Sequence, residues 1–203
     1  MKKAQKSFTL ALKLNTKNLA ATTVFAALTV ALNLSPIKFP APYLPFLYYQ
    51  VWEIPIVVAF LLFGPITGVS VSIINTAALL ALFPGALPTG PIYNLIAALS
   101  MLTGIYCAQW LTKSLDKKQK EVFLMVTVTL LGVALRVVVM SFVNWELIRY
   151  PPPVGFSMPE EVVVAIMPFV ALFNGSLAAY TVPAGYFLAK TISRGIKTPL
   201  WSP

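Results

Sequence analysis

Long apolar runs, separated by short segments rich in proline, glycine or charge, follow one another along the chain. Runs of about twenty apolar residues are long enough to cross a bilayer as helices. We predict six helices, which cover residues 18–34, 51–63, 65–83, 91–115, 121–150 and 160–193. Pro168 and Pro183 fall inside the last helix, so we expect kinks there. Only Gly64-Pro65 separates the second helix from the third, which predicts a tight helical hairpin.

This pattern predicts an all-α membrane protein with a single integral membrane domain over residues 1–203. Residues 1–17 would be a basic lead-in, residues 18–194 a six-transmembrane-helix bundle with a kinked sixth helix, and residues 195–203 a C-terminal tail. Between the first two helices lies a loop rich in proline and aromatic residues, Ser35–Gln50, whose prolines exclude a helix. Its aromatic side chains would form either a belt at the membrane surface or a lid over a flat ligand.

Composition and charge support a membrane protein. The chain is 58% hydrophobic and 10% charged, whereas soluble domains carry about 25% charged residues. With the N-terminus in the cytoplasm, Lys38 and Arg149 fall outside, Arg136 falls within the membrane, and the other twelve of the 15 cationic residues fall inside. The positive-inside rule therefore predicts a multi-pass protein of the cell membrane with both termini cytoplasmic. The net charge of +9 then reflects topology and needs no nucleic-acid partner.

Several chemistries are excluded by the residues that the chain lacks. It has no histidine and one cysteine, Cys107, which exclude histidine-based catalysis, zinc sites and a disulfide within the chain. No P-loop motif occurs, so the chain does not bind ATP through one. All six acidic residues, Glu53 among them, fall at predicted helix ends or in loops, where an ion-coupled carrier would want one at membrane depth. We therefore expect no enzyme, metal or cofactor.

The fifth predicted helix carries polar groups on one face, with Arg136 near its middle. Arg136, Met140 and Asn144 are four residues apart and point the same way. A guanidinium at the centre of a bilayer costs about 2.5–3.5 kcal/mol on insertion scales, which makes a polar cavity inside the bundle the favoured neighbour. The alternative is that Arg136 pairs only with backbone carbonyls or extends outward to the membrane surface.

Other polar residues are expected near the outer end of the same cavity: Tyr93 and Asn94, Asn174, and Glu53. Buried carboxamides need hydrogen bonds, which either another helix or a ligand supplies. Several converging amides beside the aromatic side chains of Phe39, Tyr43 and Phe46 favour a flat ligand with polar edges.

Small residues line one face of the first helix at Thr23, Ala27 and Ala31. Such a ladder lets a second helix approach closely. It is also compatible with ordinary packing inside the bundle.

At these positions the sequence resembles the substrate-binding S component of an energy-coupling factor (ECF) vitamin transporter, and within that family its riboflavin-specific branch. The most specific segments are Pro45-Phe46-Leu47 with Glu53-Ile54-Pro55, Phe63-Gly64-Pro65 with Gly68, and Arg136, Met140 and Asn144; Pro168-Phe169 with Asn174-Gly175 match more loosely. The family tends to have aspartate where Glu53 stands and a lysine where Ile74 precedes Asn75.

The resemblance implies a high-affinity riboflavin-binding subunit with no enzymatic step. It would be energised by two cytoplasmic ATPases through a transmembrane coupling subunit, which would dock on Ala27 and Ala31. Pantothenate, thiamine or a pyridoxal-like vitamin are alternative ligands. From other classes, a self-sufficient secondary carrier and a structural membrane subunit without a ligand remain open.

Overall fold

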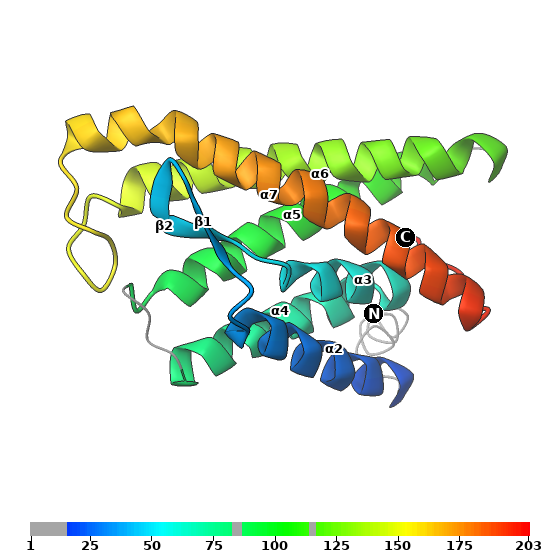
Figure 1. The fold of residues 1–203 in the computed structure, drawn as a ribbon. Coiled ribbons are helices and arrows are strands. Elements are labelled where there is room, and N and C mark those ends of the chain that lie inside the picture. The colour runs from blue at the N-terminus through cyan, green and yellow to red at the C-terminus, as the bar shows by residue number, and fades with distance from the viewer. Residues whose placement is uncertain (1–15, 83–86, 114–116) are drawn as a thin grey trace, which may run out of the picture.

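The computed structural model describes residues 16–82, 87–113 and 117–203 (Figure 1). The elements follow in the order α2 (Thr16–Leu34), β1 (Phe39–Ala41), β2 (Leu44–Tyr49), α3 (Glu53–Phe63), α4 (Pro65–Leu82), α5 (Gly90–Thr112), α6 (Lys117–Leu147) and α7 (Glu160–Gly195). Nearly all of the predicted basic lead-in lies outside the described residues.

The described residues form six helices, and five of these are long and apolar enough to cross a membrane. The remaining helix, α3, has 11 residues. At about 1.5 Å per residue it is roughly 16 Å long, about half the thickness of a hydrocarbon core. A mainly helical membrane protein is therefore confirmed, and six membrane spans stay a prediction.

The prediction that the fold is all-α is wrong between the first two helices, because this segment holds a short antiparallel hairpin. Phe39 pairs with Tyr49, Pro40 with Tyr48 and Ala41 with Leu44. Aromatic residues favour strands, and a two-stranded hairpin leaves edges on which proline is tolerated. Ala41 is buried against Phe173 and Leu177, so packing on α7 stabilises a hairpin that would be marginal alone.

Several helix boundaries differ from the prediction by a few residues, most of all those of α6. Residues 117–120, expected in a charged loop, begin α6, and α6 ends at Leu147 rather than at Tyr150. The helix α7 continues through both Pro168 and Pro183 as one element, and the kinks expected there stay a prediction.

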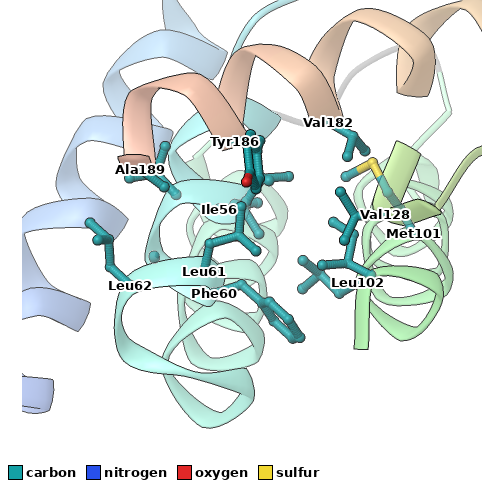
Figure 2. Packing of buried hydrophobic residues seen from close by; sticks show 14 of the residues in the cluster. Ile56, Phe60, Leu61, Leu62, Met101, Leu102, Val128, Val182, Tyr186 and Ala189 are labelled. Carbon is teal, nitrogen blue, oxygen red and sulfur yellow. The ribbon is translucent and has the colours of Figure 1, made fainter. Parts of the chain in front are cut away.

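The apolar core is centred on α3, which is buried along nearly its whole length between α7, α4, α2 and α5. Figure 2 shows Ile56 and Phe60 of α3 in one cluster with Tyr186 of α7 and with Leu102 of α5. A helix that is apolar on all sides can be satisfied only in such a central position. Its first residue, Glu53, is thereby fixed inside the bundle.

At its other end α3 is held by the C-terminal segment. The carbonyl of Leu61 would normally accept a hydrogen bond from the N–H of residue 65, but Pro65 has none. The backbone N–H of Trp201 donates to that carbonyl at 2.8 Å, and the Trp201 carbonyl accepts a bond of 2.9 Å from Gln109 Nε2 on α5. The Trp201 ring lies over Gly64, where a Cβ would be 2.9 Å from it. The predicted tail is thus an integral part of the fold.

Replacing Gly64 with alanine should destabilise the protein by about 1–3 kcal/mol, because φ at Gly64 is +92° and the added methyl group would collide with Trp201. Gly195→Ala is the matched control, since a Cβ there meets nothing within 4 Å. Thermal unfolding in detergent compares the two variants, and equal melting temperatures would contradict the role of Trp201.

Candidate ligand-binding site

A cavity of about 450 Å³ opens between the hairpin and the helices that meet near it. Its walls come from the end of α2, from β2, from the first turns of α3 and α5, and from the middle of α6 and α7. Eight of the ten binding residues expected from the sequence line it: Phe46, Glu53, Tyr93, Asn94, Arg136, Met140, Asn144 and Asn174. The structure thus brings together residues that are distant in sequence.

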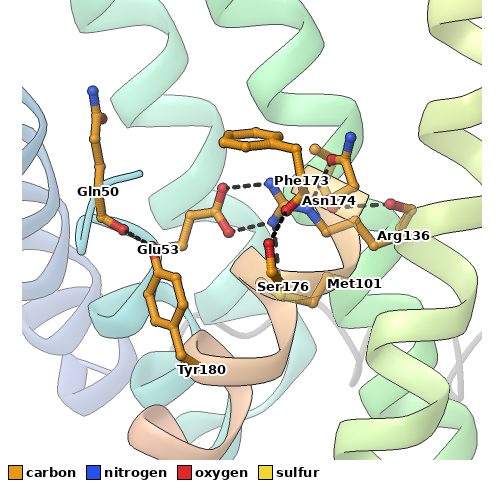
Figure 3. Close-up of polar contacts among 10 residues, drawn as sticks. Gln50, Glu53, Met101, Arg136, Phe173, Asn174, Ser176 and Tyr180 are labelled. Atoms are coloured by element: carbon orange, nitrogen blue, oxygen red, sulfur yellow. Dashed lines mark hydrogen bonds and ion pairs between the residues drawn. The ribbon is translucent and has the colours of Figure 1, made fainter. Parts of the chain in front are cut away.

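The centre of this cavity holds a buried ion pair between Arg136 and Glu53 (Figure 3). Each residue is 2% exposed. Arg136 Nη1 donates to Glu53 Oε2, and Nη2 donates to Oε1 at 3.0 Å, so the two planar groups meet as a fork on a fork. Arg136 neither pairs only with backbone carbonyls nor extends outward to the membrane surface, because it points inward and its partner is a carboxylate.

Glu53 was expected at a helix end, like the other acidic residues, and also among the residues of the cavity, and it is found in both places. Glu53 is indeed the first residue of a helix, but this helix begins inside the bundle, where the chain enters from the hairpin. A carboxylate is favourable at a helix N-terminus because the helix dipole is positive there. A position at a helix end therefore does not by itself place a carboxylate at the surface of the protein.

Carboxamides extend the network around the ion pair. Arg136 Nε donates to Asn174 Oδ1 at 3.1 Å, and Asn174 Nδ2 donates to the Val170 carbonyl at 3.0 Å. Asn144 Nδ2 donates to the Met140 carbonyl at 2.7 Å. Asn174 therefore belongs to the charged network, whereas Asn144 uses only its own helix.

Aromatic side chains form another part of the wall. Phe46 of the hairpin, Trp52 and Phe173 line the cavity. Phe46 also packs against Phe156, with ring centroids 5.3 Å apart and planes at 48°. This contact joins the hairpin to the connection between α6 and α7, so the two segments close the same end of the cavity.

Phe39 and Tyr43 do not line the cavity. Phe39 is 67% exposed. Tyr43 stacks on Phe169, with centroids 5.7 Å apart, and its hydroxyl bonds to that of Tyr49, which in turn bonds to Ser176 Oγ at 2.7 Å. Desolvation raises the pKa of Tyr43, and its hydrogen bond with Tyr49 raises it further, so Tyr43 is an uncharged hydroxyl at neutral pH. Its contacts attach the hairpin to α7.

Sequence reasoning missed several lining residues, among them Trp52, Gln50, Phe156 and Asn33. Trp52 directly precedes Glu53 in the sequence, and this adjacency could have predicted that Trp52 also lines the cavity. Asn33 lies in the last turn of α2, and its Nδ2 donates to Asn75 Oδ1 at 3.4 Å, a contact between residues that no spacing rule connects. Phe156 lies in a proline-rich connection, where no periodicity indicates direction.

The small-residue ladder of α2 faces away from the bundle. Thr23, Ala27 and Ala31 are exposed, whereas Ala26 and Thr29 of the same helix are buried. Of the two sequence-based interpretations, ordinary packing within the chain is therefore excluded for the described residues. Docking of another protein on this ladder stays a prediction.

No protein-family model matches the sequence, and no curated protein matches it. A solved structure of the S component of a bacterial ECF transporter is similar to this chain with a TM-score of 0.62 and 20% sequence identity. The similarity covers 90% of this chain and 96% of that one. At this identity it shows that the chain has the fold of that S component.

The ion pair can be tested by removing each partner. Arg136→Met leaves the Glu53 carboxylate buried without a counter-charge and should lower the free energy of unfolding by about 3–5 kcal/mol. Combining it with Glu53→Leu should restore much of this loss, because the double variant buries no charge. Thermal unfolding in detergent measures both, with Arg149→Met as a control on the half-buried Arg149. A double variant less stable than either single variant would contradict the pairing.

Proposed function

We propose that this chain is the substrate-binding S component of an ECF-type importer and that it captures riboflavin in the cavity beside the hairpin. The observation that carries the proposal is a cavity of about 450 Å³, lined by aromatic rings and carboxamides, in a chain with the fold of an S component. Cavities of about 300–1,000 Å³ are typical of sites for small organic ligands.

The walls of the cavity suit a flat ring with polar edges. Phe46, Trp52 and Phe173 offer aromatic faces to a stacked ring. Asn94 and Asn144 offer hydrogen-bonding groups to its edge and to a hydroxylated side chain. In this proposal Phe46 is the hairpin residue that contacts the ring, and Tyr43 positions the hairpin on α7.

The energy for transport would come from other subunits. The sequence contains no P-loop, and the described residues contain no cluster of acidic, histidine or cysteine side chains that could hold a metal. In the proposal two cytoplasmic ATPases act through a transmembrane coupling subunit that docks on the exposed ladder of α2. Exposed small residues permit the close helix contact that such docking needs.

A self-sufficient carrier is the second candidate, because the buried Glu53 provides the interior carboxylate that the sequence did not indicate. Both oxygens of Glu53 are bound to Arg136, however, which leaves this carboxylate neutralised by a fixed cation. A carboxylate that carries protons or sodium must exchange its partner in each cycle. The S-component proposal is therefore the better supported of the two.

Riboflavin binding should be visible as quenching of its fluorescence on addition of the purified protein. Asn144→Ala should weaken binding by about 1–3 kcal/mol, or about 5- to 150-fold, if the ligand satisfies that amide. Phe46→Ala should also weaken it, through lost stacking, whereas Phe39→Ala is the matched control because Phe39 is exposed. Unchanged fluorescence at micromolar riboflavin would refute this vitamin as the ligand.

Docking of the coupling subunit can be tested separately from binding. Ala27→Trp or Ala31→Trp should prevent assembly with the coupling subunit and abolish uptake, because the indole holds the helices apart, while riboflavin affinity stays unchanged. Ala165→Trp is the control, an exposed alanine on α7. Co-purification and vesicle uptake measure the outcome, and normal assembly of both α2 variants would show that this face is not the docking site.

A further inference from the structure

We infer that Glu53 and Arg136 act together as a charge filter, which sets the cavity to bind an uncharged ligand and to reject carboxylate and ammonium compounds. The inference rests on the proposed function, because it concerns the ligand of the same cavity. It goes further by assigning specificity to one pair of residues.

The first observation is that the charges deep in the cavity cancel. Among the residues that the structure describes, three charged ones line it: Glu53, Arg136 and Lys38. Lys38 is exposed, and its ammonium lies 5.8 Å from the centre of the Tyr48 ring, so solvent screens it at the rim. Glu53 and Arg136 are buried and paired. A ligand that enters therefore meets no net charge in the interior.

The second observation is that the two Arg136 nitrogens that would bind a ligand carboxylate already bind the carboxylate of Glu53. Glu53 fills the fork of Nη1 and Nη2, Asn174 takes Nε, and the sulfur of Met101 lies 3.9 Å behind Nη1. A ligand carboxylate would have to displace Glu53, which would then be a buried charge without a partner. An ammonium ligand that approached Glu53 would be repelled by the Arg136 cation that is paired with it. Either ion loses its hydration without gaining a counter-charge.

The third observation is that the hydrogen-bonding groups left open are neutral. Within the described part of the chain, the side chains of Asn94 and Gln50 have no hydrogen-bond partner, and Asn144 uses only its Nδ2. Carboxamides donate and accept without charge, so they match imide, amide and hydroxyl groups. Recognition of the polar edge is therefore assigned to these carboxamides, and the ion pair is a positioning and excluding element.

The test measures the affinity of the full-length purified protein for four vitamins by calorimetry. Riboflavin and pyridoxine carry no net charge at neutral pH and are called uncharged here, pantothenate is a carboxylate and thiamine is a cation. We expect an uncharged compound to bind the original protein at least 100-fold more tightly than pantothenate or thiamine. Pantothenate or thiamine binding as tightly as the best uncharged compound would overturn the inference.

Glu53→Gln supplies the sharper comparison, because it keeps the shape of the side chain and leaves the Arg136 cation unneutralised. The ratio of pantothenate affinity to that of the best uncharged compound should rise at least tenfold. It should return to the original value when Arg136→Gln is added, since the double variant is again neutral. Glu160→Gln, an exposed acid at the start of α7, is the control. A ratio that Glu53→Gln does not change would overturn the role of Glu53.

The two proposals fail in different ways. If riboflavin does not bind but pyridoxine does, and the charged vitamins do not, the proposed vitamin is wrong and the charge filter is supported. If riboflavin binds and pantothenate competes with it at similar concentration, the vitamin is supported and the filter is wrong. If the folded protein binds neither uncharged compound, both are contradicted. Should Glu53→Gln fail to fold, the comparison of the four vitamins on the original protein decides the question.

Discussion

The ion pair between Glu53 and Arg136 is the interaction on which the polar site inside the bundle depends. Two charged groups cannot remain inside an apolar protein unless each is the partner of the other and the remaining polar atoms are satisfied. Meeting that condition brings the first turn of α3 against the middle of α6, and Asn174 adds α7 to the same point. The cavity lies where these three helices meet, so the pair fixes the polar groups of its wall.

The helix α3 links this polar centre to the opposite end of the molecule. It begins at the ion pair and ends at Gly64-Pro65, where Trp201 completes the hydrogen bonding that Pro65 cannot provide. Between these ends its side chains are buried on every side. A short helix held at both ends and packed all around is a rigid element. The hairpin is attached to α7 through Ala41, Tyr43 and Tyr49, and its Phe46 packs against Phe156 in the connection between α6 and α7, so it closes one end of the cavity.

The residues of the site that could be predicted share a local rule. Arg136, Met140 and Asn144 lie four residues apart on one helix, and helical geometry places them on one face whatever the rest of the chain does. All three line the cavity. No local spacing rule of this kind predicts which residues of the hairpin face the cavity. Phe39 and Phe46 are both aromatic residues of one proline-rich segment, but Phe46 lines the cavity and Phe39 is 67% exposed.

The sequence by itself determined the membrane class and the approximate extents of the helices, and it indicated which helix face carries polar groups. These properties follow from hydropathy, proline positions and helical spacing, which act over a few turns of chain. Only the tertiary structure decided that Glu53 is the partner of Arg136, 83 residues away, and that Trp201 completes the end of α3. Such pairings depend on how helices cross in space, and no local pattern encodes a crossing. The charge of the site is therefore a property of the fold.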